Sequence, residues 1–114
     1  MKSEDRDAAY LWDMRKFARE SHAIVRRVAF ERLEKNSIRR LALERTLELV
    51  GEAAGRVNQK FQKEHPEIDW RGLIGQRNVI AHDYGEIDHR RLYDAARLKI
   101  PSLIAELDRI LGDD

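Results

Sequence analysis

The chain has 114 residues, enough for one modest hydrophobic core, so we predict a single domain over residues 1–114. It has no cysteine, which excludes disulfides and thiolate zinc sites, and its 22 Lys and Arg nearly balance its 21 Asp and Glu. A net charge of +1 argues against binding nucleic acid through bulk charge alone but leaves room for a local basic site. The first twenty residues show no apolar signal core, and the longest uncharged run is residues 100–105. We therefore expect a soluble, cytoplasmic protein with no membrane segment.

Helical periodicity dominates the first half of the chain. Residues 4–30 are predicted to form one long amphipathic helix, because apolar and small side chains recur at steps of three and four: Tyr10, Leu11, Met14, Phe17, Ala18, Ser21, Ile24, Val25 and Val28. Asn36 and Ser37 are good N-cap types, so a second helix is predicted to start there. Its stripe follows the same steps, through Leu43, Leu47, Val50, Ala54, Val57 and Phe61.

Two features of this second helix carry further predictions. Pro66 should end it, because the residue before a proline is disfavoured in helical conformation. The segment "GEAAG" at residues 51–55 places two glycines inside the helix, at a cost of about 1 kcal/mol each relative to alanine. We interpret these small residues as the place where another helix crosses closely.

The second half of the chain predicts two more helices. Asp69 can cap a third helix that starts near Trp70 and turns Leu73, Ile74 and Ile80 inward, with Gly85 suited to its C-terminal turn. Asp88 can cap a fourth helix, and Pro101 predicts a kink or break near Ile100; the apolar face consists of Leu92, Ala96, Leu103, Leu107 and Ile110. No stretch shows strand alternation. The predicted fold is an all-α, up-and-down bundle of four to five helices.

The stretch "RNVIAHDYG" at residues 77–85 gathers four chemically active side chains. On a helix with about 100° per residue, Asn78 and His82 are neighbours one turn apart, and Arg77 and Tyr84 share the adjacent stripe. Arg77 and His82 are separated by about 140°, which a long guanidinium can span. We expect all four to border one shallow surface at the end of the third helix.

These residue types suit RNA cleavage without a metal. A 2′-hydroxyl must lose a proton to attack the adjacent phosphorus, and the leaving 5′-oxygen must gain one; the imidazole of His82 can do either. The planar guanidinium of Arg77 can bind two oxygens of the charged transition state, and Asn78 is a candidate for orienting the imidazole. Because one histidine cannot be base and acid at once, a symmetric dimer would supply the second.

Two other interpretations of the same residues are open. His82 could be only a favourable charge at a helix C-terminus. A metal site is the second, because five potential ligands lie within eight residues: His82, Asp83, Glu86, Asp88 and His89. The two histidines lack the i, i+4 spacing of helical metal ligands, so we predict no metal site.

The remaining histidines and the arginine pairs receive simpler predictions. His22 and His65 fall outside the constellation and are expected to be solvated. The "RR" pairs at 26–27, 39–40 and 90–91 are expected on ordinary polar faces, where some could guide a phosphate backbone toward the site.

Together with its flanking segments, this motif resembles the HepT-like proteins, small members of the HEPN superfamily that act as toxins of nucleotidyltransferase-paired toxin–antitoxin systems. The resemblance rests on Arg77 and His82 in an arginine-x4-histidine motif, extended by Tyr84 to "RNVIAHDY". Upstream, "LELVGEAAGRV" and "HPEIDW" occur in the family's order and spacing, and downstream "IPSLIAEL" is similar to its final helix. The likeness covers residues 5–111. The stretch 28–37 is more charged than the family's pattern, which leaves the first inter-helix loop undefined.

The resemblance implies a helical homodimer whose motif helices meet in an endoribonuclease centre that needs neither metal nor cofactor and cuts RNA, either tRNA or mRNA. It implies that Arg77 and His82 are catalytic, Asn78 supports them, and Tyr84 is the modification site. It further implies a partner, a minimal nucleotidyltransferase antitoxin that neutralises the toxin of this type II system by transferring AMP from ATP to Tyr84. The alternative is a non-enzymatic helical module that binds and regulates a nucleotidyltransferase, which would not need both Arg77 and His82.

Overall fold

The computed structural model describes residues 3–83 and 86–112. Across these residues every element of regular secondary structure is helical, which confirms the predicted all-α class, although the chain is divided into more helices than the four to five predicted. The elements are α1 (Ser3–Val25), α2 (Phe30–Glu34), α3 (Ser37–Arg56), α4 (Gln59–Glu64), α5 (Trp70–His82), α6 (His89–Asp94), the π-helical turn η1 (Ala95–Lys99) and α7 (Ile100–Leu111).

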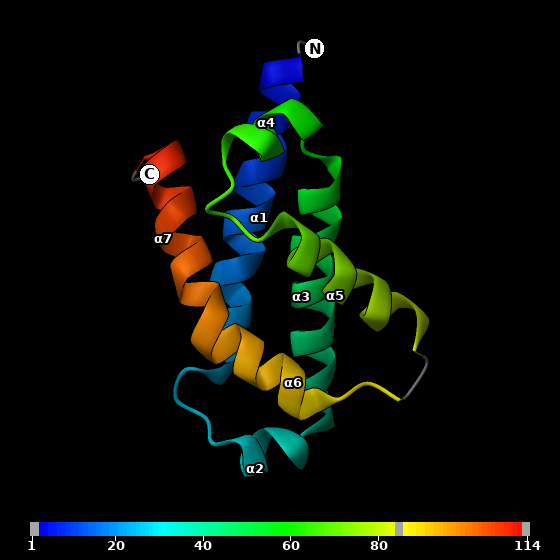
Figure 1. Ribbon diagram of the computed structural model, residues 1–114. Helices are drawn as coiled ribbons and strands as arrows, with labels where there is room; N and C mark the ends of the chain where they lie inside the picture. Colours follow the sequence, from blue (N-terminus) through cyan, green and yellow to red (C-terminus); the bar gives the residue numbers. More distant parts are fainter. Residues whose placement is uncertain (1–2, 84–85, 113–114) are drawn as a thin grey trace.

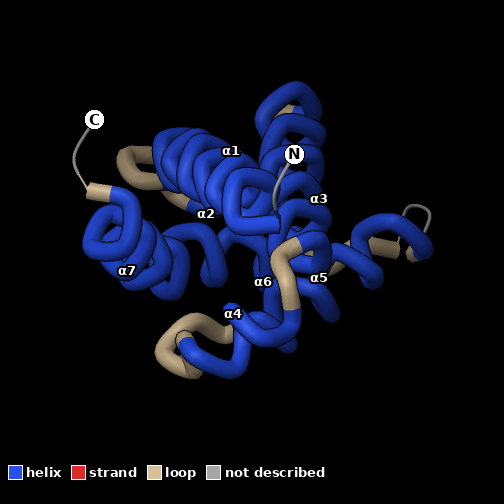
Figure 2. Tube along the Cα trace, turned by 90° about the horizontal axis from the view of Figure 1, so that it is seen from above, coloured by secondary structure: helices blue, strands red, loops and turns tan. Residues whose placement is uncertain are grey.

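Three long helices form the body of the bundle. Figure 1 shows α1 between α3 on one side and α7 on the other, with α1 running opposite to both of them. Helix α5 packs obliquely across α3, and its C-terminal end projects beyond the other helices (Figures 1 and 2). The end of α5, at His82, therefore lies at an outer corner of the bundle.

The first helix ends earlier than the apolar stripe predicts. Helix α1 stops at Val25, where the chain turns through a hydrogen bond from the Val28 N–H to the Val25 carbonyl (3.1 Å), and α2 follows. The prediction of a helix through residue 30 was wrong because the turn brings Leu33, in the charged stretch, into the core, where it is fully buried.

The second helix begins as predicted but breaks before Pro66. The Asn36 side chain caps α3 by accepting from the Arg39 N–H at 3.1 Å. After Arg56 the backbone becomes extended at Val57, and Asn58 caps a separate helix, α4, by accepting from the Lys60 N–H at 2.7 Å. The predicted single helix is therefore two helices, because Asn58 is a second N-cap residue inside an unbroken apolar stripe. The periodicity of the apolar residues does not reveal this break.

The second half of the chain follows the predicted boundaries. Asp69 caps α5 through the Gly72 N–H (3.0 Å), and Asp88 caps α6 through the Arg91 N–H (3.2 Å). The break expected at Pro101 is the turn η1, in which the Ile100 N–H reaches back five residues to the Ala95 carbonyl. Gly85, the expected C-terminal turn of α5, lies outside the described residues.

The core consists mostly of the predicted stripes. The fully or nearly fully buried side chains include Met14, Ala18, Leu43, Leu47, Val50, Ala54, Leu92, Ala96, Leu103 and Leu107. Arg15 is also buried, and its Nη1 donates to Asp108 Oδ1 (3.0 Å) and to the Gly112 carbonyl (2.7 Å), which ties α1 to the end of α7. Within the described ranges, no helix combines the length and apolarity needed to cross a bilayer.

Candidate active site

The close helix crossing predicted at "GEAAG" is present, and it seats Arg77. A Cβ atom placed on Gly51 of α3 would lie 2.3 Å from Arg77 Cβ and 2.6 Å from the Leu73 carbonyl oxygen, far inside normal contact. At Gly55, one turn later, the nearest atom would be Ile74 Cγ1 at an ordinary 3.8 Å. Gly51 is thus the residue that allows the α5 backbone and the stem of Arg77 to rest directly on α3.

The guanidinium of Arg77 is half-buried and is held from two sides. Its Nη2 pairs with Glu52 Oε1 on α3, and its Nη1 donates to Asn78 Oδ1, both at 3.3 Å. Both distances exceed the usual 2.7–3.2 Å of N–H···O bonds. The Nε–H is buried and has no hydrogen-bond partner among the described residues. The arginine is therefore fixed at its stem, while its two outer nitrogens lie at the surface in long bonds that can be exchanged for a ligand.

His82 is the last residue of α5 and is exposed. It lies one turn after Asn78, as the motif spacing predicts, but no hydrogen bond joins the two side chains in the described part of the chain. Nor does the ring bond to the terminal carbonyls of α5; the Asp83 N–H caps the Val79 carbonyl instead (3.0 Å). The structure therefore links Asn78 to Arg77, and it leaves the imidazole open to solvent.

An outward stripe runs along α5 beside this arginine. Gly75, Asn78, Val79 and His82 follow the spacing i, i+3, i+4, i+7, and all four are exposed. Val79 has 47% of its surface exposed, and a Cβ on Gly75 would meet nothing within 4 Å. This small, partly apolar face has no covering element among the described residues.

The other candidates in the motif region separate from one another. His89 Nε2 lies 2.6 Å from Glu44 Oε2 of α3, and Asp88 is engaged in capping α6. Among residues 3–83 and 86–112, no group of three or more His, Asp or Glu side chains is arranged to hold a metal ion. Tyr84, the expected modification site, lies outside the described residues.

The prediction that His22 and His65 are solvated was wrong, because both are half-buried and bonded. His22 Nδ1 lies 3.2 Å from the Ala96 carbonyl oxygen, between α1 and η1. His65 stacks on Phe61 at 4.3 Å between ring centroids, and its Nδ1 is 2.9 Å from Glu67 Oε1. The hydrogen bond from His65 is the largest influence that lowers the pKa of Glu67 below its ordinary value.

Sequence reasoning gave no role to Glu52 and none to Gly51 individually. The signal was the paired glycines of "GEAAG", which pointed to a close crossing without saying which side chain of the crossing helix would be seated there. A carboxylate next to such a glycine, on the helix that the motif arginine must contact, is the pattern that would have identified Glu52.

Comparisons with known proteins identify the family of this chain. Residues 14–110 match the family model described as "Ribonuclease HepT-like". A protein of Thermococcus cleftensis named "Probable ribonuclease HepT" is 30% identical over 110 residues, covering 96% of this chain and 98% of its own. A Methanocaldococcus jannaschii protein named "Putative RNase MJ1380" is 27% identical over 100 residues, covering 88% and 92%. No solved structure matches the chain. The chain therefore belongs to the HepT-like family and is a ribonuclease, as the sequence predicts.

Proposed function

We propose that this ribonuclease is the toxin of a nucleotidyltransferase-paired toxin–antitoxin system and cuts cytoplasmic RNA, tRNA or mRNA, without a metal through Arg77 and His82. The observation that carries the proposal is the seating of Arg77. Its stem rests on Gly51 and its guanidinium is oriented by Glu52, while His82 lies exposed on the same helix. A fixed cation and a solvent-exposed imidazole on one helix supply a ligand for the phosphate and one proton carrier for 2′-hydroxyl chemistry.

The proposed reaction is an intramolecular transfer of the RNA phosphoryl group from the 5′-oxygen to the neighbouring 2′-oxygen. The 2′-hydroxyl gives its proton to an imidazole, its oxygen bonds to phosphorus, and the bond to the 5′-oxygen breaks as that oxygen takes a proton. The products are a 2′,3′-cyclic phosphate and a 5′-hydroxyl. Arg77 would exchange its long bond to Asn78 for two phosphoryl oxygens, because charge-assisted bidentate pairs are stronger than bonds to a neutral amide.

The second proton carrier requires a second copy of His82, so the proposal includes a homodimer. The exposed stripe Gly75, Asn78, Val79 and His82 supports the α5 helices as the meeting place. A glycine with free space above it allows two helix backbones to approach closely, and Val79 offers apolar surface at the contact. Such an arrangement would set the two imidazoles on either side of one shared groove.

Tyr84 is the proposed target of the antitoxin. It follows His82 by two residues, so a modified phenol stays close to the end of α5. An AMP group would add a phosphodiester anion and an adenosine beside the site. The anion could pair with Arg77 and the bulk could obstruct an RNA strand, so both effects oppose substrate binding.

The catalytic proposal is tested with two histidine substitutions compared on one RNA. His82→Ala should lower the cleavage rate by about 10²–10⁴-fold, the usual contribution of a general acid or base. His89→Ala is the matched control, because this histidine is seven residues away and pairs with Glu44. A loss below tenfold for His82→Ala, or equal losses for both variants with unchanged circular dichroism, would contradict the assignment.

The switch is tested by co-expression with the cognate nucleotidyltransferase. Mass spectrometry should show AMP-sized additions on the peptide that contains Tyr84. Tyr84→Phe should fold, keep at least part of the cleavage activity and escape neutralisation. Additions that map elsewhere, or a phenylalanine variant that is silenced as readily as the parent, would assign the switch to another residue.

A further inference from the structure

The near-zero net charge of the chain hides a strong separation of charge. Residues 26–45 and 89–99 contain eleven of the 22 Lys and Arg but only four of the 21 Asp and Glu. These two segments, which we call the basic end, thus have an excess of seven positive charges, while the rest of the chain is net acidic. Such a local excess can bind a polyanion even though the molecule as a whole is almost neutral.

The two segments are far apart in sequence but form one end of the bundle. Helix α2 packs against both the start of α3 and α6, at the lower end in Figure 1. The Tyr93 hydroxyl donates to the Val28 carbonyl (2.6 Å), and the Phe30 and Tyr93 rings meet edge to face at 5.6 Å. Ten of the eleven basic side chains at this end are exposed: Arg26, Arg27, Arg32, Lys35, Arg39, Arg45, Arg90, Arg91, Arg97 and Lys99.

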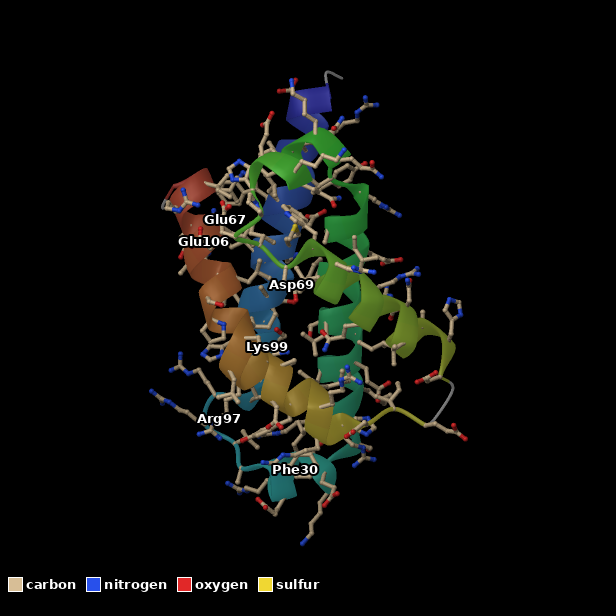
Figure 3. The ribbon with its side chains drawn as sticks, viewed as in Figure 1. Phe30, Glu67, Asp69, Arg97, Lys99 and Glu106 are labelled. Atoms are coloured by element: carbon tan, nitrogen blue, oxygen red, sulfur yellow. The ribbon has the colours of Figure 1, made fainter. Side chains whose placement is uncertain are left out.

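Two of these arginines are held in place by aromatic rings. The Arg90 guanidinium lies over Phe30 at 5.0 Å, and that of Arg97 lies 5.8 Å from the centre of the Tyr93 ring while its Nη1 donates to the Tyr93 hydroxyl. Figure 3 shows Phe30 and Arg97 at the same lower end of the molecule. Cations that are already ordered lose less side-chain entropy when they bind a phosphate.

The acidic side chains at the basic end oppose this charge only in part. Asp94 pairs with Arg90 (3.3 Å), and Glu44 lies against His89. Glu44 also fixes the distance from the basic end to the candidate active site, because Glu52, the partner of Arg77, lies eight residues further along α3. At 1.5 Å per residue, the two contacts are about 12 Å apart along the helix axis. A short RNA strand can therefore contact both places.

We propose that the basic end is a docking surface for the phosphate backbone of single-stranded RNA, which it presents to the Arg77–His82 site; this inference rests on the proposed ribonuclease function. The charge excess favours RNA as the occupant, because an RNA strand carries one negative charge at every phosphate and so matches a surface with seven surplus positive charges. Ile38 and Leu98 are 78% and 72% exposed among these charges and offer apolar surface to bases. The binding expected is independent of sequence and strongly dependent on salt.

The test removes one exposed charge from each of the three helices that meet at the basic end. The triple variant is Arg32→Gln, Arg39→Gln and Arg91→Gln. It leaves in place the backbone N–H groups of residues 39 and 91, which donate to the capping side chains of α3 and α6. The matched control removes the same charge from the opposite end, with three exposed residues neutralised: Arg56→Gln, Lys60→Gln and Arg71→Gln. All variants are made in the full chain, with and without His82→Ala.

Two readouts separate docking from catalysis. The first is the affinity of the His82→Ala proteins for an RNA of about 20 nucleotides, longer than common single-strand sites of about 4–16, at several salt concentrations. The second is cleavage of a dinucleotide by the proteins that retain His82, since a dinucleotide is too short to reach the basic end. We expect the basic-end variant to bind RNA at least tenfold more weakly at low salt. The slope of log affinity against log salt concentration should become shallower by up to about 2, since three phosphate contacts are lost at about 0.7 each. Dinucleotide cleavage should be unchanged.

Several results would overturn the docking proposal. Equal loss of RNA affinity in the basic-end and control variants would show that only total charge matters, and unchanged affinity in both would show that RNA binds elsewhere. If the basic-end variant keeps its RNA affinity but no longer associates with the nucleotidyltransferase, the surface serves a protein partner instead. Failure of the unsubstituted chain to cut either substrate would refute the proposed ribonuclease site, whereas the RNA affinities would still decide the docking surface.

Discussion

Replacing Gly51 by alanine should displace Arg77 and the α5 backbone that carries the candidate active site. The added Cβ would lie 2.3 Å from Arg77 Cβ and 2.6 Å from the Leu73 carbonyl oxygen, whereas carbon atoms in contact are separated by about 3.5–4.0 Å. Because one obstacle is the backbone of α5, a side-chain rotation cannot relieve the overlap. Helix α5 must move away from α3 by about 1 Å.

The change in the free energy of unfolding caused by Gly51→Ala is the sum of two opposing contributions. Overpacking of a close contact costs about 1–3 kcal/mol. Alanine in place of glycine inside a helix stabilises by about 1 kcal/mol. Gly55→Ala is the matched control, because it brings the same helix propensity one turn away, where its Cβ meets only Ile74 at 3.8 Å. Gly51→Ala should therefore be less stable than Gly55→Ala by about 1–3 kcal/mol.

The two variants are compared by urea unfolding and by RNA cleavage. A displacement of about 1 Å at a catalytic group can lower the rate about 10²-fold, so Gly51→Ala should lose most of its activity while remaining folded. Gly55→Ala should keep parental activity and gain up to about 1 kcal/mol in stability. If the two variants had equal stability and equal activity, the seating of Arg77 on Gly51 would have no functional role.

Three further predictions concern the surroundings of the same arginine. Glu52→Gln should slow cleavage by about tenfold, because Glu52 orients the Arg77 guanidinium. It should lower stability by less than about 1 kcal/mol, because the Arg77–Glu52 ion pair is about one-third exposed. The control Glu48→Gln, one turn earlier on α3, should change neither the cleavage rate nor the stability. Arg77→Ala should slow cleavage more than Asn78→Ala does, since neutralising the transition-state phosphate contributes more than a supporting amide; the reverse ranking in variants of equal thermal stability would show that the roles are misassigned. Val79→Lys places a charge on the exposed face of α5, so it should convert the dimer into monomers in sedimentation at micromolar concentration and abolish cleavage. A parent protein that is monomeric and still cuts RNA would disprove an active site shared by two subunits.

The apolar stripes of the sequence predicted the helices and their inward faces, because burial follows periodicity directly. They did not predict where α1 ends, since Val28 continues the stripe although it lies in the turn after the helix. Nor did they predict the break at Val57, where a capping residue, Asn58, competes with an unbroken apolar pattern. Arg15 was also missed, because a charged side chain is buried only when a distant partner receives it, here Asp108 and the end of α7.

For the candidate site, too, the local features could be predicted from the sequence and the tertiary contacts could not. The spacing of Arg77, Asn78 and His82 along one helix is a local property, and the structure retains it because α5 is helical through residue 82. The contact of Arg77 with Glu52 is a tertiary property, since it depends on how closely α5 crosses α3. The same holds for the basic end, which arises only when segments about sixty residues apart fold onto one another.

The most direct test of the proposed catalytic centre is the chemistry of the cut ends of RNA after incubation with the purified protein in excess EDTA. Cleavage by Arg77 and His82 should continue under these conditions and leave a 2′,3′-cyclic phosphate and a 5′-hydroxyl, identified by mass spectrometry of the fragments, and His82→Ala should yield about 10²–10⁴-fold less of them in the same time. Loss of cleavage in EDTA, or fragments that end in a free 3′-hydroxyl, would contradict the mechanism.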